Sequence, residues 1–90
     1  MRVGIGVDSH GFDASMPLVL GGVEFPDMPG LSGHSDGDVV AHALIDALLG
    51  AANLGDIGAM FPSDDNELAG ISSLLLLSRT YRRVHDAGYE

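Results

Sequence analysis

The hydrophobic positions near the N-terminus alternate with small or acidic ones. The run VGIGVD at positions 3–8 places three β-branched residues on one side of an extended chain and two glycines and an aspartate on the other. This period of two predicts a β-strand over Arg2–Asp8. Because glycine has no side chain to fill space, the glycine face is expected to let another element pack closely against it.

The next stretch is predicted to be a hairpin between irregular segments. Gly11–Ser15 is expected to form a loop, and Pro17–Leu20 and Val23–Phe25 are expected to be short strands. Gly21-Gly22 between them is typical of a two-residue hairpin turn. Two prolines and two glycines in Pro26–Gly33 predict an irregular segment that leads to the centre of the chain.

The central pattern changes from a period of two to a helical one. Val, Ala, Leu and Ile dominate residues 39–52, which predicts a helix ending near Ala52, where Asn53 or Gly55 would stop it. Asp36 or Asp38 is expected to cap its N-terminus, because a carboxylate there accepts from free backbone N–H groups. A helix this apolar is expected to be buried on most of its surface.

Polar residues on this helix form a single stripe. Asp38, His42 and Asp46 are four residues apart and therefore lie on one face. A titratable group on a buried helix is costly unless it is paired, hydrogen-bonded or bound to metal. His42 is therefore expected to have a partner elsewhere in the chain, and Asp46 fits a packing or supporting role.

A second helix is predicted from about Ser72 to Ala87, capped by Ser72 or Ser73 and ended by Gly88. Its expected apolar stripe consists of Leu76, Leu77, Tyr81 and Val84. Leu75 falls on the polar side and hints at a subunit contact. The loop Ser63–Asn66 between the helices can be read as a plain solvated connection.

Composition narrows the functional classes. Ninety residues are one small domain or part of one, and without cysteine any metal must be held by His, Asp or Glu. The formal charge is −9 and there is no lysine, which argues against a nucleic-acid partner. The apolar runs are too short to span a bilayer and no signal peptide is evident, so we expect a cytoplasmic protein, free of the membrane.

Three residues are candidate metal ligands. Asp8 and His10 would point the same way on an extended chain, and His42 would join them if its helix packs on that segment. Two histidines and a carboxylate with a free fourth position match the composition of a catalytic zinc site. Two alternatives remain open: in one, Asp8 simply orients a surface His10; in the other, His42 is a core histidine bonded to a backbone carbonyl.

The motifs resemble one enzyme family. MRVGIGVDSHGF near the N-terminus and the run GLSGHSDGDVVAHALIDALLGAANLGDIGAMFPSDD from residue 30 are similar to the 2-C-methyl-D-erythritol 2,4-cyclodiphosphate synthase family of non-mevalonate isoprenoid biosynthesis. The resemblance covers nearly the whole chain, with the motifs in order and at the family's spacing. One small departure is Ser72-Ser73, where the family pattern has an Asp-Ser pair.

The resemblance implies roles for individual residues. Asp8, His10 and His42 match the family's zinc ligands, and His34 matches a catalytic residue that stabilises the transition state. A second divalent cation, Mg²⁺ or Mn²⁺, is expected to bridge the substrate diphosphate. The positions that correspond to substrate contacts are Asp8, Ser9, His10, His34, Ser35, Asp56, Ile57, Gly58, Phe61, Pro62, Ser63, Asp64 and Asp65.

The resemblance also implies a fold, an assembly and a reaction. The fold is expected to be α/β in the broad sense, an α+β arrangement of ferredoxin-like character with helices on a mixed sheet. The family forms homotrimers with active sites between subunits. Its members are phosphorus–oxygen lyases that act on a small cytidine diphosphate-linked substrate in the bacterial cytoplasm, closing a cyclic diphosphate and releasing CMP.

The length of the chain leaves other functions open. Members of the family continue well beyond residue 90, so this single domain is expected to be the N-terminal part of a larger one, and the 90 residues alone are expected to be inactive and poorly folded. One alternative is a non-catalytic metal-binding fragment. Another is a zinc phosphohydrolase with the same ligand set, which would give linear rather than cyclic products.

Overall fold

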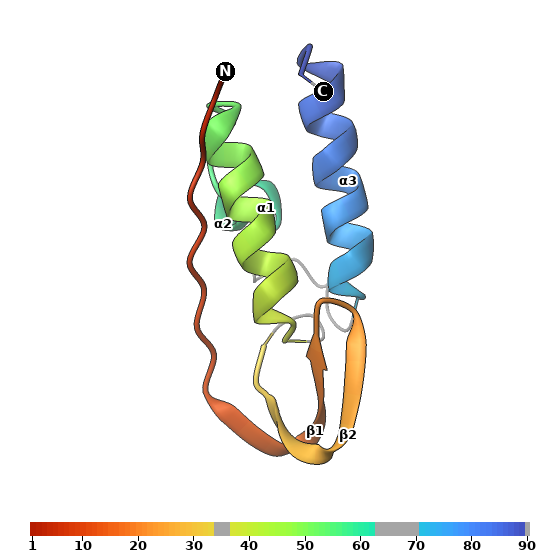
Figure 1. The fold of residues 1–90 in the computed structure, drawn as a ribbon. Helices are drawn as coiled ribbons and strands as arrows, with labels where there is room; N and C mark the ends of the chain where they lie inside the picture. The colour runs from red at the N-terminus through yellow and green to blue at the C-terminus, as the bar shows by residue number, and fades with distance from the viewer. Residues whose placement is uncertain (34–36, 63–70, 90) are drawn as a thin grey trace.

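The computed structural model describes residues 1–33, 37–62 and 71–89. In chain order they form strands β1 (Phe12–Leu20) and β2 (Val23–Leu31) and helices α1 (Val39–Ala51), α2 (Ile57–Met60) and α3 (Ser73–Asp86). Figure 1 shows α1 and α3 running side by side, with the β1–β2 hairpin at one end and the chain termini at the other. None of the helices in these three ranges has the length and apolar character needed to cross a bilayer.

The predicted hairpin turn is confirmed. β1 and β2 pair antiparallel, with Leu20 opposite Val23. The two turn residues, Gly21 and Gly22, have φ values of 58° and 82°. Two consecutive positive φ angles belong to a type I′ turn, which glycine adopts without steric cost.

Both strands are longer than the sequence predicts. β1 begins at Phe12, inside the expected loop Gly11–Ser15, and β2 continues to Leu31 through the stretch predicted to be irregular. Both of those predictions were wrong. In a two-stranded ribbon each strand has one free edge, so a proline can face that edge without removing a ladder hydrogen bond. The pairing does shift register on either side of Pro17.

The N-terminal segment, residues 1–11, is extended but is not a β-strand, so the strand predicted over Arg2–Asp8 is not formed. A strand requires a hydrogen-bonded neighbour, and among the described residues the only sheet is the β1–β2 ribbon. The expected mixed sheet is therefore not formed within these ranges either. The architecture they do show is α+β: an antiparallel ribbon with helices.

The glycine face of the N-terminal segment packs directly on α1, as predicted. A Cβ atom added at Gly4 would lie 2.0 Å from the carbonyl oxygen of Ala47, and one added at Gly6 would lie 1.6 Å from that of Ala43. No side chain fits there, because the obstructing atoms belong to the helix backbone. Figure 1 shows this segment, in red, following α1 along its length.

Helix α1 begins and ends where the sequence predicts. Asp38 is its N-cap, and the side chain accepts from the backbone N–H of Ala41 at 3.1 Å. After the C-cap Ala52, positive φ angles at Asn53 (57°) and Gly55 (100°) turn the chain away. Most of the helix is at least partly buried, although Val40 and Leu44 remain about half exposed.

Helix α3 completes the core. Ile45 and Leu49 of α1 are fully buried against Leu76 of α3, with Ile57 and Phe61 among the partly buried residues around them. The predicted cap Ser72 is confirmed by its side chain, which accepts from the backbone N–H of Leu74 at 3.2 Å.

The expected apolar stripe of α3 is only partly correct. Leu76 and Val84 are buried, but Tyr81 is 58% exposed. Ser73 and Thr80 are fully buried in its place, and the Thr80 hydroxyl donates to the carbonyl of Leu76 at 2.9 Å. That internal hydrogen bond lets a polar residue occupy a core position.

Candidate metal centre

The structure brings the three predicted ligands together. Asp8 and His10 come from the N-terminal segment and His42 from α1, and one ligand atom from each lies within 4.8 Å of the others. Asp8 Oδ2 is 2.7 Å from His10 Nε2 and 3.3 Å from His42 Nδ1, and the two ring nitrogens are 3.3 Å apart. His42 is buried, as expected of a core histidine, but its Nδ1 faces Asp8 and His10.

The other ring nitrogen of His10 determines which atom is available to a ligand. His10 Nδ1 is hydrogen-bonded to the backbone carbonyl of Ser32. A carbonyl can only accept, so Nδ1 carries a hydrogen, and in the neutral ring Nε2 is left with a lone pair. This nitrogen is 2.7 Å from Asp8 Oδ2. Either a proton on Nε2 or a cation held between the two atoms satisfies the contact.

His42 is held in a similar way on the opposite side. Its Nε2 lies 2.8 Å from the hydroxyl oxygen of Ser73, the first residue of α3, and this contact is buried. The remaining nitrogen, Nδ1, points at His10 and Asp8. Metal-binding histidines typically use one nitrogen for the ion and engage the other in a hydrogen bond. Both histidines of this cluster follow that pattern.

The donor set fits a divalent cation. Tetrahedral zinc with ligands at about 2.1 Å would separate each pair of donor atoms by roughly 3.4 Å. Both contacts of His42 Nδ1 are close to that separation, and only the Asp8–His10 pair is tighter. The side chains of Asp8, His10 and His42 are 21%, 14% and 10% exposed, so the cluster is sheltered but reachable from solvent. Ser9, between two of the ligands, is exposed.

The other two acidic residues of the α1 stripe have structural partners. Asp38 is fully buried and accepts from the backbone N–H groups of Gly21 and Gly22 at 2.9 and 2.7 Å, in addition to capping the helix. Asp46 accepts from the backbone N–H of Ile57 at 2.7 Å. One acid therefore ties the hairpin turn to α1, and the other positions the start of α2.

The predicted substrate-contact positions after α1 lie on and around α2. Asp56 is the N-cap of this helix, accepting from the backbone N–H of Ala59 at 2.8 Å. Gly58 and Pro62 are exposed, whereas Ile57 and Phe61 pack partly against the core. The remaining predicted positions, His34, Ser35, Ser63, Asp64 and Asp65, lie outside the described residues.

Sequence reasoning missed the groups that orient the ligands. Ser73 was considered only as a possible helix cap, and its side chain faces His42 instead. The Ser32 carbonyl carries no side-chain signature at all. The only sequence signal for the Ser73 contact is its place on the buried side of α3, three residues before Leu76.

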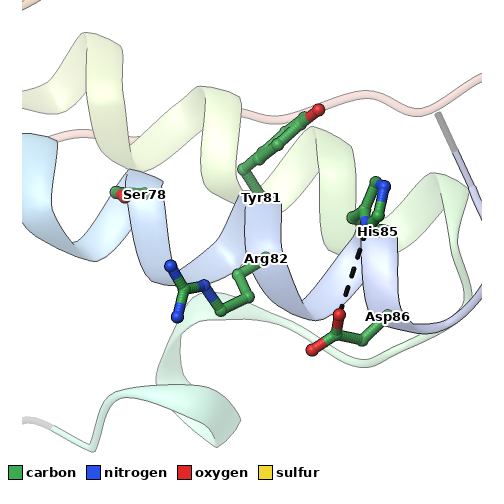
Figure 2. Close-up of a pocket in the computed structure, with 5 residues that line it drawn as sticks. All are labelled: Ser78, Tyr81, Arg82, His85 and Asp86. Carbon is green, nitrogen blue, oxygen red and sulfur yellow. Dashed lines mark ion pairs between the residues drawn. The ribbon is translucent and has the colours of Figure 1, made fainter.

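The outer face of α3 has a separate polar pocket, which Figure 2 shows. It is lined by Ser78, Tyr81, Arg82, His85 and Asp86. His85 and Asp86 form an ion pair at 3.9 Å, with side chains that are 62% and 70% exposed. Because a pair this exposed is strongly screened by water, it is not a convergent ligand site. We assign His85 no role.

An α+β domain that presents one carboxylate and two imidazoles to a common point has the ligands of a protein that binds a divalent metal ion. A family model described as the YgbB family matches residues 1–90. The chain belongs to the YgbB family.

Curated relatives carry consistent names. The chain is 58% identical over 89 residues to a 2-C-methyl-D-erythritol 2,4-cyclodiphosphate synthase of Syntrophobacter fumaroxidans, covering 99% of this chain and 56% of that protein. It is 54% identical over 90 residues to the synthase of Clostridium acetobutylicum, covering 100% of this chain and 58% of that protein. It is also 56% identical over 89 residues to a bifunctional enzyme IspD/IspF of Clavibacter michiganensis, covering 99% of this chain and 22% of that protein.

Solved structures agree with the fold. The bifunctional IspDF of Campylobacter jejuni superimposes with a TM-score of 0.91 at 46% identity, covering 99% of this chain and 24% of that one. A 2C-methyl-D-erythritol-2,4-cyclodiphosphate synthase in a CDP-bound form gives a TM-score of 0.86 at 45% identity, covering 97% of this chain and 58% of that one. The chain thus spans little more than half the length of the synthases it matches, and less of the bifunctional enzymes.

Proposed function

We propose that the protein converts 4-diphosphocytidyl-2-C-methyl-D-erythritol 2-phosphate to 2-C-methyl-D-erythritol 2,4-cyclodiphosphate and CMP. The observation that supports this proposal most strongly is the convergence of Asp8, His10 and His42 on one point, within 4.8 Å of one another. The names of the relatives and the CDP bound to one of the matching synthase structures support a cytidine nucleotide substrate.

The residues of the cluster would hold a divalent cation, with zinc favoured by the donor set of two imidazoles and one carboxylate. A bound cation supplies Lewis-acid polarisation of a phosphoryl oxygen. Asp8 and His10 fix one side of the site through the Ser32 carbonyl, and His42 fixes the other through α1. The chain thus provides a rigid, partly sheltered support for an anionic group.

The reaction makes modest demands on acid–base chemistry. The attacking 2-phosphate is already ionised near neutral pH, so no general base has to activate it, and the main requirement is to bring two anionic groups into line. A chain of net charge −9 without lysine has few side chains that could neutralise them. Metal ions and backbone N–H groups are therefore the expected partners of the phosphates.

The further assignments of the proposal rest on the family resemblance. His34 is proposed to stabilise the transition state. A second cation, Mg²⁺ or Mn²⁺, is proposed to bridge the diphosphate. The substrate is proposed to be contacted by residues around the cluster and α2, namely Asp8, Ser9, His10, His34, Ser35, Asp56, Ile57, Gly58, Phe61, Pro62, Ser63, Asp64 and Asp65.

A homotrimer with active sites between subunits is proposed as the assembly, and light scattering coupled to gel filtration would test it. A monomer under assay conditions would contradict this part of the proposal. Because the substrate is a small multiply charged molecule that does not cross membranes unaided, the cytoplasm is the proposed site of action.

The central experiment measures CMP release from synthetic substrate, before and after chelation of divalent ions, by a chain that carries these 90 residues at the full length of the matching synthases. The 90 residues alone are expected to be inactive. We expect chelation to abolish release and Zn²⁺ plus Mg²⁺ to restore it. Phosphorus NMR of the product should show the cyclic diphosphate. Linear hydrolysis products would identify a phosphohydrolase instead, and unaltered substrate together with stoichiometric metal uptake would identify a non-catalytic metal-binding protein.

A diffraction map at the zinc absorption edge tests the metal centre independently of turnover. An anomalous peak between Asp8, His10 and His42 is expected. No peak there in crystals grown with Zn²⁺ would contradict the proposed centre whatever the activity.

A further inference from the structure

Ser73 lies where two helices meet the metal cluster. It is the first residue of α3, it is fully buried, and its hydroxyl oxygen is 2.8 Å from Nε2 of His42 on α1. The two residues are 31 positions apart in the chain, so the contact is made by the packing of α3 on α1. A hydroxyl at a position this buried needs a hydrogen-bond partner, and His42 provides one.

We propose that Ser73 is a positioning residue for the metal centre, which sets the ring orientation of His42. This inference rests on the proposed metal site. In the proposed arrangement the Ser73 hydroxyl accepts from Nε2–H of His42, and Nδ1 is left as a lone pair directed at Asp8 and His10. Were Nδ1 to carry the hydrogen instead, it could not bind a cation.

The geometry explains why one hydroxyl is enough to select the ring orientation. The terminal torsion of a histidine is broad and roughly two-fold, and a half-turn about it would put ring carbons in the places of the two nitrogens. Ser73 stands on the side of the ring opposite to the cluster, so it rewards only the orientation that points Nδ1 at Asp8 Oδ2, 3.3 Å away. Partners of this kind typically contribute 10–100-fold to metal affinity.

The neighbouring serine provides a matched control. Ser72 is exposed and uses its side chain to cap α3, accepting from the backbone N–H of Leu74 at 3.2 Å. Removing that hydroxyl should lower the melting temperature by weakening the start of the helix, without touching His42. The pair therefore separates an effect on α3 from an effect on the imidazole.

The test measures Zn²⁺ affinity by competition with a chromophoric chelator, for the purified parent protein and for Ser73→Ala and Ser72→Ala. We expect Ser73→Ala to bind Zn²⁺ 10–100-fold more weakly, and Ser72→Ala to bind like the parent while melting at a lower temperature. Equal affinity of Ser73→Ala and the parent would overturn the inference. So would an equal loss in both variants, because the effect would then belong to the start of the helix.

A second measurement needs no substitution. In the Zn²⁺-loaded, ¹⁵N-labelled parent, NMR should show a hydrogen on Nε2 of His42 that exchanges slowly with water. An Nε2 hydrogen that exchanges as fast as that of a solvent-exposed imidazole would overturn the inference even if Ser73→Ala failed to fold. If the parent takes up no Zn²⁺ at all, the proposed metal centre fails together with this inference. Binding by the parent that is unaffected in Ser73→Ala defeats the inference alone.

Discussion

The N-terminal segment and the α1–α3 helix pair contribute to one site but are held in different ways. The helix pair shares a core in which Ile45, Leu49 and Leu76 are at most 4% exposed. The N-terminal segment buries almost none of its apolar side chains: Val3, Ile5 and Val7 are 79–83% exposed. It touches α1 instead through the backbone of its glycines.

Because of this difference, the three proposed metal ligands are supported unequally. His42 stands on the element with a hydrophobic core behind it, whereas Asp8 and His10 stand on the element without one. Burial of apolar surface contributes roughly 25 cal/mol per Å², so the segment gains little from that source. A cation bound to all three residues would therefore act as a tie between the two regions and stabilise their contact by mass action.

The largest expected effect comes from removing the proposed metal ligand on α1. His42→Ala should weaken Zn²⁺ binding at least about 100-fold, because losing one of three direct ligands costs more than the roughly 10–100-fold lost with an outer hydrogen-bond partner. Turnover should be lost with it. Isothermal calorimetry with Zn²⁺ checks this, with His85→Ala on the exposed face of α3 as the control. Equal losses in both variants would contradict the assignment of the cluster.

Breaking the helix region itself should be next in size. Asp38→Ala removes a buried carboxylate that accepts from Ala41, Gly21 and Gly22. Leaving these backbone N–H groups without their acceptor should lower the free energy of unfolding by about 3 kcal/mol. Urea unfolding measures the loss, and Asp38→Asn, which keeps one acceptor oxygen, should lose less. A change below 1 kcal/mol in Asp38→Ala would contradict the proposed role of this carboxylate.

Disrupting the contact of the N-terminal segment with α1 should lower the free energy of unfolding somewhat less. It should also weaken Zn²⁺ binding. Gly6→Ala places a methyl group 1.6 Å from the carbonyl oxygen of Ala43, so the segment must move away from α1. Overpacking of this kind costs about 1–3 kcal/mol and should weaken Zn²⁺ binding, since Asp8 and His10 move with the segment.

The control for that experiment lies on the same segment. A Cβ at Gly11 would meet only the Ser32 hydroxyl, at an ordinary 3.6 Å, so Gly11→Ala should leave Zn²⁺ affinity unchanged. Parent-like affinity in Gly6→Ala would show that the segment is not held by its glycines. The comparison between the two regions would then have to be withdrawn.

The smallest effect concerns the hairpin, away from both regions. The Ser15 hydroxyl and backbone N–H donate to Asp13 at 2.6 and 2.9 Å and lower the pKa of that carboxyl below its usual 3.8. A lowered pKa in the folded state stabilises above the unfolded value, and the contribution is lost as pH falls through the folded pKa. Carbon-detected NMR titration should show the Asp13 pKa rising toward 3.8 in Ser15→Ala. An unchanged pKa would assign the shift to another cause.

The sequence by itself determined the elements whose signals are local. The two-residue turn at Gly21-Gly22 and the ends of both long helices follow from the conformational preferences of single residues and their neighbours. For each cap the sequence left two candidates, and the structure selects Asp38 and Ser72. The ligand types and the motif spacing likewise indicate, from the sequence alone, a metal centre at Asp8, His10 and His42. The helical register of His42 and the alternation of the N-terminal segment depend only on the backbone period.

Strand pairing, the buried face of α3 and the orientation of the two histidines were decided by tertiary structure, because each depends on residues distant in sequence. Residues 2–8 alternate like a strand, yet no described neighbour pairs with them, so the pattern alone could not say whether a ladder forms. Tyr81 shares the apolar period of α3 and is exposed, while Thr80 is buried, because the position of α1 determines which face of α3 is covered. The hydrogen bonds that the two histidines make to the Ser32 carbonyl and the Ser73 hydroxyl exist only once separate segments have packed together.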